Sequence, residues 1–409
     1  MTLAPPRVAL LAPYWSFFEA SVPFDLRADR VALLDAVAEL LGAGGVEVLA
    51  RELVEDRAAA RAAAARIAAA QPDALVLVQS MAVPPAFALA ALGALPELPL
   101  VVLAATRRAR FDAQLDHAAI TSEGATVGVP QLTNVLHRRG RAHALTVLAL
   151  DAADDGAATA LAASVRAAAA AGRLQRARIA RVGRPIDGYD CVDCDADALR
   201  TATGIALVDV PPADVRAAYL AADPARAAAL ADEARATFAL ADDVEADECL
   251  ARSVRFAAAL EALDARLDVD AGAMNCHVPE IRFASDEPGI TPCYALGRET
   301  SRGIPWSCAG DVVTAVALLA AKLLGGAALY HEIEALDHAS GEALLANSGE
   351  HDIAFADPDA RPQLVRNRWW AADPRCGACA CFGPPAGPAT LIAFTPHAGE
   401  RSGFRFVVA

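Results

Sequence analysis

Lysine, methionine and aromatic side chains are scarce in this sequence. Of its 409 residues only Lys322 is a lysine, three are methionines, and aromatic residues make up 5%. The basic side chains are therefore almost all arginine, which together with the heavy use of alanine reflects genomic base composition rather than chemistry. The formal net charge of −15 argues against a nucleic-acid or anionic-membrane partner.

Membrane-directing segments are also missing. The start, MTLAPPRVALLAPYW, lacks the basic region and the long apolar stretch of a signal peptide. The longest apolar runs, such as residues 315–324, are too short and too rich in alanine to span a bilayer. We therefore expect a cytoplasmic location with no membrane partner.

Several common catalytic motifs do not occur. No expected strand is followed by G-x-G-x-x-G or G-x-x-x-x-G-K-[ST], which excludes the usual dinucleotide fingerprint and the P-loop. No G-x-S-x-G elbow occurs either. The segment HEIEA begins like the zinc motif H-E-x-x-H, but Ala335 occupies the position of the second histidine.

The nine cysteines are odd in number and unevenly spaced, so we expect mostly unpaired thiols. Two clusters, CVDC at 191–194 and CGACAC at 376–381, could in principle bind zinc with four thiolates. They fall in different predicted domains, and the first is flanked by acids. Free thiols are the preferred interpretation, and a structural zinc ion and a regulatory disulfide remain alternatives.

Apolar strands alternate with alanine-rich helices along the first two thirds of the chain. Expected strands cover residues 7–13, 46–50, 73–80, 98–105, 143–151, 176–183, 203–210, 267–276 and 304–308. Continuous Val, Leu and Ala strands separated by helices are typical of parallel sheets covered on both faces. Ligands of such sheets bind beyond the carboxyl ends of the strands.

The length and this pattern predict an α/β protein of three domains. Residues 1–143 and 144–326 would form two doubly wound parallel-sheet domains, with a boundary after the basic segment HRRGRAH. Residues 327–409 would form a smaller β-rich domain, because glycine and proline accumulate there and the segments ATLIAF and FRFVV favour short antiparallel strands.

Reactive side chains are concentrated between residues 274 and 352. Each has an ordinary explanation: Asp311 suits the N-cap of a helix over residues 312–324, His277 suits a loop, and Glu332 suits one face of an edge strand. Their concentration in one segment favours a functional site. An acid at a strand-to-helix turn, an acid on the next strand and a distant histidine would suit a hard ion such as Mn²⁺ and proton transfer between sugar carbons.

The order PCYALGRETSRGIPWSCAGDVVTAVALLAAKLLGG, LYHEIEALD and LLANSGEHD resembles the L-fucose isomerase / L-arabinose isomerase family, in its fucose isomerase-like branch. The likeness extends over most of the chain. It implies the three domains given above, Mn²⁺-assisted aldose–ketose interconversion of a small sugar or polyol, and a homo-oligomer.

The resemblance also implies roles for individual residues. Glu332 would be a metal ligand and catalytic acid, and Asp311 a second catalytic group, with His331 as a further metal ligand. Substrate contacts would come from Asn347 and His277. The loop after the first strand would add a sugar-stacking face, for which a place in the core is an equal alternative; its residues are Tyr14, Trp15 and Phe17.

Two departures from the family pattern stand out. Ala309 replaces the glutamate of the family motif C-E-G-D, which is both metal ligand and proton-transfer group in that family. Loss of a positioned acid or base typically lowers the rate by about 10²- to 10⁴-fold. Members also supply a late histidine ligand, and His397 does not align with it. Three residues are candidates to replace the missing glutamate: Glu299, Asp311 and His331.

Two main hypotheses about function follow. The first is a sugar isomerase with altered metal ligation, and the second is a non-catalytic descendant that binds a carbohydrate or acts as a partner subunit. Ala309 is the feature that separates them, and a zinc–thiolate protein is a weaker third hypothesis.

Overall fold

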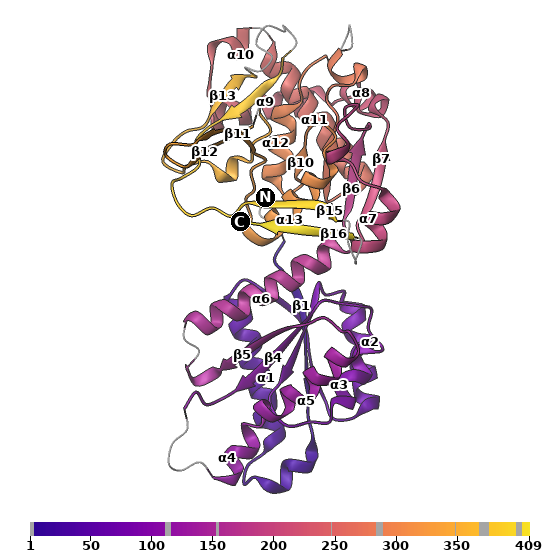
Figure 1. Cartoon of the computed structure of the whole chain (residues 1–409), viewed down its shortest axis with the longest axis vertical. Coiled ribbons are helices and arrows are strands. Elements are labelled where there is room, and N and C mark those ends of the chain that lie inside the picture. The colour runs from indigo at the N-terminus through magenta and orange to yellow at the C-terminus, as the bar shows by residue number, and fades with distance from the viewer. Residues whose placement is uncertain are drawn as a thin grey trace. The chain divides into compact units, whose positions relative to one another are not determined.

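The computed structural model describes residues 4–110, 116–152, 155–246, 248–283, 289–347, 349–367, 376–397 and 403–409 (Figure 1). Contacts divide this part of the chain into two compact units, residues 4–173 and 174–409, which are described separately. Each unit is built on a parallel sheet flanked by helices, and the second also carries a β-rich C-terminal region. The predicted α/β class is thus confirmed.

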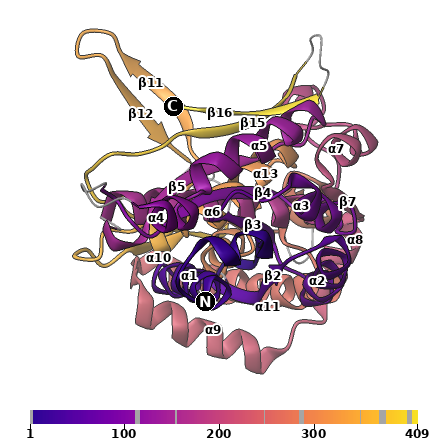
Figure 2. The ribbon, with the colours of Figure 1, turned by 90° about the horizontal axis from the view of Figure 1, so that it is seen from below.

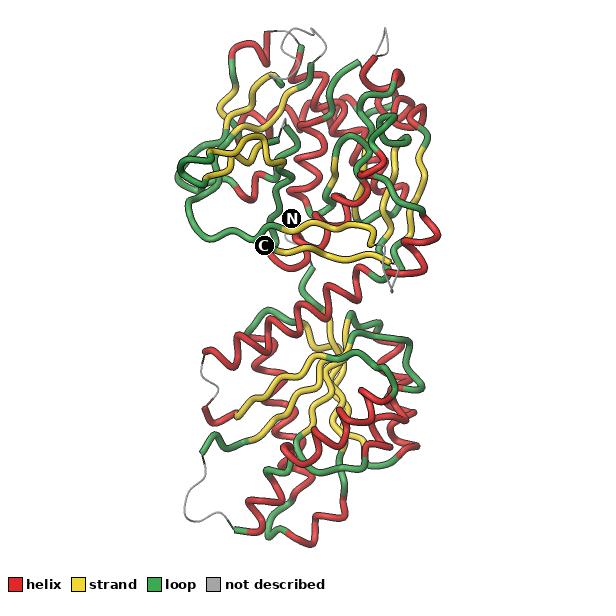
Figure 3. The backbone as a smooth tube through the Cα atoms, in the orientation of Figure 1, coloured by secondary structure: helices red, strands yellow, loops and turns green. Residues whose placement is uncertain are grey.

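The first unit has a five-stranded parallel sheet of order β2-β1-β3-β4-β5, visible as adjacent strands in Figure 3. The strands are β1 (Arg7–Pro13), β2 (Glu47–Val54), β3 (Ala74–Gln79), β4 (Leu100–Thr106) and β5 (Ala144–Ala149). The helices are α1 (Leu26–Ala43), α2 (Arg57–Ala70), α3 (Pro85–Leu92), α4 (His117–Ser122), α5 (Ala125–Arg138) and α6 (Asp155–Leu174), with a 3₁₀ turn at Ser16–Ser21.

Alternate residues of these strands face two separate apolar cores. Val8 and Leu10 of β1 pack against α1 and α6, whereas Ala9 and Leu11 pack against α2, α3 and α5. Since successive side chains of a strand point to opposite faces, a strand that is apolar throughout requires a helical layer on each side. The continuous Val, Leu and Ala strands of the sequence therefore dictate this three-layer arrangement.

The first unit extends past the boundary predicted near residue 143. β5 pairs in parallel with β4, with Leu145 beside Val102, and Leu161 and Val165 of α6 lie in the core of the first unit. The contact-based division falls instead after Arg173. The strand–helix pattern continues across residue 143 because β5 and α6 complete the first sheet, so periodicity alone could not mark the division.

The second unit contains a four-stranded parallel sheet of order β10-β9-β6-β7. Its strands are β6 (Arg178–Val182), β7 (Ala206–Val210), β9 (Ala271–Met274) and β10 (Trp306–Ser307). Its helices are α7 (Ala196–Thr203), α8 (Pro212–Leu220), α9 (Pro224–Thr237), α10 (Asp242–Ala246), α11 (Cys249–Leu267), α12 (Cys293–Arg302) and α13 (Val312–Gly325). Short turns lie at Leu150–Ala152 in the first unit and, in the second, at Asp190–Val192, Pro279–Phe283 and Ile353–Phe355.

Helices cover both faces of this second sheet. α8, α9, α11 and α12 pack on one face, and α7 and α13 pack on the other. The indole ring of Trp306 lies so close to Gly272 of β9 that a Cβ there would be 2.4 Å from the ring. Glycine is therefore required at this position for β9 and β10 to pair.

The β-rich region packs onto the second unit. β13 (Gln363–Arg366) pairs with β14 (Ala378–Cys381) and also with β8 (Ala239–Leu240), which follows α9. The hairpin of β15 (Ile392–His397) and β16 (Gly403–Val408) contributes Phe394 to the core beneath α13. Residues 327–409 thus share their core with the sheet domain.

A second hairpin, formed by β11 (Glu332–Asp337) and β12 (Glu342–Ala346), extends away from its unit (Figure 2). Every residue of β11 is exposed, including Ile333 and Leu336. Among the described residues, no helix combines the length and apolar character needed to cross a membrane.

Candidate functional site

The carboxyl ends of β9 and β10 meet at one edge of the second sheet. The two strands pair in parallel, with Trp306 beside Gly272, and the chain leaves them through Asn275 and Cys308 respectively. The Asn275 side chain donates a hydrogen bond of 2.6 Å to the carbonyl of Arg184, which follows β6. Ligands of parallel α/β sheets bind beyond this edge, so it is the candidate functional site.

The turn between β10 and α13 is strained. Ala309 and Gly310 both have left-handed backbone conformations, with φ values of 55° and 75°. A Cβ at Gly310 would lie 3.0 Å from the Cα of Pro185, so glycine is required there. At Ala309, however, the Cβ is present and costs of order 1–3 kcal/mol. This strained alanine stands where the resemblance places a glutamate.

Asp311 caps α13, as the sequence predicts. Its Oδ1 accepts a 2.8 Å hydrogen bond from the Thr314 amide, and its Oδ2 accepts one of 2.7 Å from the Thr314 hydroxyl. The Tyr330 hydroxyl also donates to Oδ2, at 3.4 Å. Burial raises the pKa of Asp311, although these hydrogen bonds oppose the shift. Both carboxylate oxygens are thus already engaged.

Glu350 is the carboxyl group at the centre of the site. Its side chain is 2% exposed, its Oε1 accepts a long hydrogen bond of 3.4 Å from Asn347, and its Oε2 has no partner in the described structure. The thiol of Cys308 lies near enough to influence the pKa of this carboxyl group. Burial raises the pKa of Glu350. A buried carboxyl group with a free oxygen is well suited to exchange protons with a ligand.

His351 carries a second free polar atom. Its Nδ1 lies 2.7 Å from the carbonyl oxygen of Ala380, so this nitrogen is assigned as the protonated donor. In the neutral ring Nε2 is then an acceptor, and it is buried without a partner in the described structure. The ring meets that of His331 edge to face, with centroids 5.8 Å apart. Burial, and then the proximity of His351, lower the pKa of His331.

Glu332, the predicted metal ligand and base, begins the exposed strand β11. Partial burial raises its pKa, and the negative charges of Glu334, Glu350 and Asp311 raise it further. The carboxyl group therefore belongs to the electrostatic environment of the candidate site, although much of the side chain faces solvent.

The predicted substrate contacts Asn347 and His277 both lie beside this edge. Asn347 accepts a 2.9 Å hydrogen bond from the Gly349 amide and donates to Glu350, so it fixes the turn that presents Glu350. The amide of His277 donates to Asn275. Burial, followed by the charge of Arg282, lowers the pKa of His277, which favours the neutral ring.

A buried ion pair holds this segment in place. The ammonium of Lys322, in the last turn of α13, lies 2.7 Å from Oδ2 of Asp352. The same oxygen accepts the Ala328 amide at 3.0 Å, and Oδ1 accepts the Ala354 amide. Asp352 thereby joins α13, the loop that leads to Tyr330 and the segment that carries Glu350.

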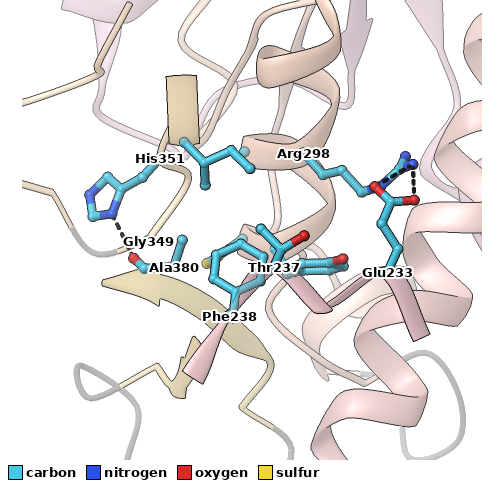
Figure 4. Close-up of a pocket in the computed structure, with 11 residues that line it drawn as sticks. Glu233, Thr237, Phe238, Arg298, Gly349, His351 and Ala380 are labelled. Atoms are coloured by element: carbon cyan, nitrogen blue, oxygen red, sulfur yellow. Dashed lines mark hydrogen bonds and ion pairs between the residues drawn. The ribbon is translucent and has the colours of Figure 1, made fainter. Parts of the chain in front are cut away.

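A small pocket of about 350 Å³ adjoins the same segment (Figure 4). Gly349 and His351 line one part of it, and the ion pair between Glu233 and Arg298 lines another. Phe238 contributes an aromatic wall. Much of this volume is open to solvent, and the enclosed part has room for little more than a water molecule beside the Glu350 turn.

The aromatic loop lies in the first unit. Tyr14 is fully buried and its hydroxyl donates to Glu19 at 2.6 Å. Its ring therefore belongs to the core, the alternative given above, and offers no stacking face to a sugar. Trp15 stacks on Phe17 with ring centroids 4.6 Å apart, and Phe17 is exposed.

Glu299 does not lie at this site. It is completely buried on α12, where Arg302 donates to both of its oxygens and Arg298 to one. Its role is therefore structural, and it does not replace the missing glutamate. The nine cysteines, all in the described part of the chain, are free thiols.

The described residues do not complete a ligand set for Mn²⁺. Ala309 offers no side-chain donor, both oxygens of Asp311 already accept hydrogen bonds, and Glu332 lies on an exposed hairpin. Within the described ranges, no three His, Cys, Asp or Glu side chains are grouped so that they could hold an ion. Manganese therefore remains a prediction from the resemblance.

Sequence reasoning missed Glu350, His351 and Tyr330. All three lie in polar segments, and Glu350 and His351 contact residues distant in sequence, such as Gly297 and Ala380. The run G-E-H-D, at the end of a segment rich in reactive side chains, is the one local signal that could have drawn attention to Glu350 and His351.

The chain matches no protein-family model and no curated protein sequence. The resemblance to the fucose isomerase-like branch, the activity, the sugar or polyol substrate and the homo-oligomer that it implies therefore stay predictions.

Proposed function

We propose that the carboxyl edge of the second sheet binds a small polyhydroxylated molecule and that the protein is an aldose–ketose isomerase in which Glu350 moves the proton. The observation that carries this proposal is the buried carboxyl of Glu350, with one unpartnered oxygen, whose charge acts on Glu332 as that of Asp311 does. Glu350 thus takes over the role of the glutamate that Ala309 replaces.

The chemistry requires a base that removes a proton from C2 of the aldose and returns it to C1. The proton on the C2 hydroxyl moves to the carbonyl oxygen, so that an aldehyde becomes a ketone with no net gain or loss of atoms. A general base works best when its pKa is near the working pH. Burial shifts the pKa of Glu350 in that direction.

His351 and Tyr330 would orient the substrate. The free Nε2 of His351 is a hydrogen-bond acceptor for a sugar hydroxyl, and the Tyr330 hydroxyl lies beside Asp311. Residues of this kind can hold a polyol in one orientation through hydrogen bonds to its hydroxyl groups.

A second candidate is a non-catalytic protein that binds a carbohydrate. Ala309 favours it because it removes the acid of the standard mechanism, and Asp311 is committed to the helix cap.

Ketose formation from a panel of aldoses, measured with EDTA and with added Mn²⁺, distinguishes the two candidates. The isomerase proposal predicts turnover that falls at least about 10²-fold in Glu350→Gln. Glu342→Gln, on the exposed strand β12, serves as the matched control and should keep full activity.

Saturable sugar binding without turnover under either metal condition would establish the second candidate instead. Ala309→Glu restores the family acid. If this variant alone binds Mn²⁺ and turns over sugar, the natural protein has lost the metal-dependent reaction.

A further inference from the structure

A second pocket lies at the opposite edge of the second sheet. Val269 and Ile304, which precede β9 and β10, help to line it, so it lies at the amino ends of these strands. The last turns of α11 and α12 complete its wall, and it encloses about 510 Å³, part of which is open to solvent. The proposed proton-transfer site uses none of these residues.

Asp264 lines this pocket and is only 4% exposed. Its Oδ2 accepts a 3.2 Å hydrogen bond from the indole N–H of Trp306. Its Oδ1 is buried and has no partner in the described structure. A buried polar atom without a partner typically destabilises a protein by about 1–3 kcal/mol, so a ligand that donates a hydrogen bond to Oδ1 would be stabilising.

The arginines near Asp264 form ion pairs with other acidic residues. Glu261 accepts hydrogen bonds from Arg226 and Arg298 and pairs with Arg302 at 2.9 Å. Glu299 binds both Arg298 and Arg302. Within the described residues, no basic side chain forms an ion pair with Asp264, so the charge of Arg302, which also lines the pocket, acts on this carboxyl group only from a longer distance.

The helix end adds to the negative potential. Asp264 and Asp268 are four residues apart in the last turn and at the C-cap of the 19-residue helix α11. The carboxyl end of a helix carries a partial negative charge, which disfavours acids and favours cations. Asp268 is exposed at the pocket rim. Two acids are therefore unfavourable at this helix end, and a cation bound beside them would offset the effect.

We propose that this pocket binds a small primary alkylammonium ion, whose ammonium group donates to Oδ1 of Asp264 and to Asp268. The alkyl chain would contact Ala265, Val269 and Ile304, which supply the apolar part of the lining. Burial raises the pKa of Asp264, and a bound cation offsets that shift by favouring the ionised carboxylate.

The indole N–H of Trp306 provides a direct reporter, because it donates to Asp264. Full-length protein labelled with ¹⁵N-tryptophan would be titrated with n-propylammonium chloride, with potassium chloride as the control for ionic strength. The Trp306 signal is assigned by its loss in Trp306→Phe. We expect a saturable shift of this signal with propylammonium and none with potassium.

Asp264→Asn keeps an oxygen that can accept from Trp306 but removes the charge, so propylammonium affinity should fall at least about tenfold. Asp268→Asn, at the exposed rim, should weaken binding without perturbing the fold. Asp214→Asn, an exposed acid on α8, should leave the affinity unchanged. Absence of a saturable shift in the natural protein, or equal affinity in all three variants, would overturn the proposal.

Discussion

The ammonium of Lys322 lies 2.7 Å from Oδ2 of Asp352, and both side chains are almost completely buried. Lys322 is also the single lysine of the chain, in which arginine carries every other long-chain positive charge. Asp352 accepts two backbone hydrogen bonds besides, from Ala328 and Ala354. This ion pair fixes the two segments that bring Glu350 and Tyr330 together.

Lys322→Met should destabilise the protein by about 3–5 kcal/mol, because it leaves the charge of Asp352 buried and unpaired. Urea unfolding followed by circular dichroism measures the change. The double variant Lys322→Met with Asp352→Asn should recover part of the loss, since no isolated charge remains. Arg51→Met, which breaks the exposed pair with Asp35, should cost less than about 1 kcal/mol. Equal losses for the buried and exposed pairs would contradict this interpretation.

Ala309→Gly should stabilise the protein by about 1 kcal/mol, because it removes the Cβ from a left-handed backbone position. Ala321→Gly, inside α13, is the matched control and should destabilise by about 1 kcal/mol, since glycine weakens a helix interior. The same chemical change thus has opposite signs at two nearby positions. Thermal unfolding of both variants tests this, and destabilisation by Ala309→Gly would show that the turn is not strained.

Glu350→Gln should change how stability depends on pH. Burial raises the pKa of Glu350 above its ordinary value of 4.5, so the folded state binds this proton more tightly than the unfolded state. The stabilising effect of that proton is fully present below about pH 4 and is lost as the pH rises through the folded-state pKa. Glutamine has no proton to lose in this pH range, so the variant does not lose stability in this way as the pH rises.

The variant should therefore gain stability relative to the natural protein as the pH rises from 4 to 8. Free energies of unfolding at several pH values measure the difference. Glu342→Gln, on the exposed strand β12, should show almost no such trend. A difference between Glu350→Gln and the natural protein that does not vary with pH would show that Glu350 is not buried.

Sequence patterns were sufficient to predict those strands and helix caps that depend only on residues close together in the chain. The strand over residues 7–13 has the observed bounds, and Asp311 caps α13 because an acid directly precedes an apolar helical run. The covered parallel sheets follow likewise from strands that are apolar on both faces. In these cases the physical cause lies within a few residues.

Features that depend on distant contacts could not be predicted in this way. Glu350 lies in a polar run, and its burial involves a remote element, since Gly297 of α12 packs against the backbone of Glu350 and His351. Glu299, proposed from sequence as a substitute acid, is instead neutralised by arginines on its own helix. The division after Arg173 reflects pairing of β5 with β4, which strand–helix periodicity does not specify.

Exchange of the C2 hydrogen of an aldose in ²H₂O tests the central claim most directly. If Glu350 removes and returns this proton, the natural protein will introduce deuterium into the recovered sugar, detected by ¹H NMR, even where ketose accumulates slowly. Glu350→Gln, checked for its fold by circular dichroism, should lose this exchange. Equal exchange by both proteins, or none by the natural protein with any aldose that binds, would contradict the assignment of Glu350 as the base.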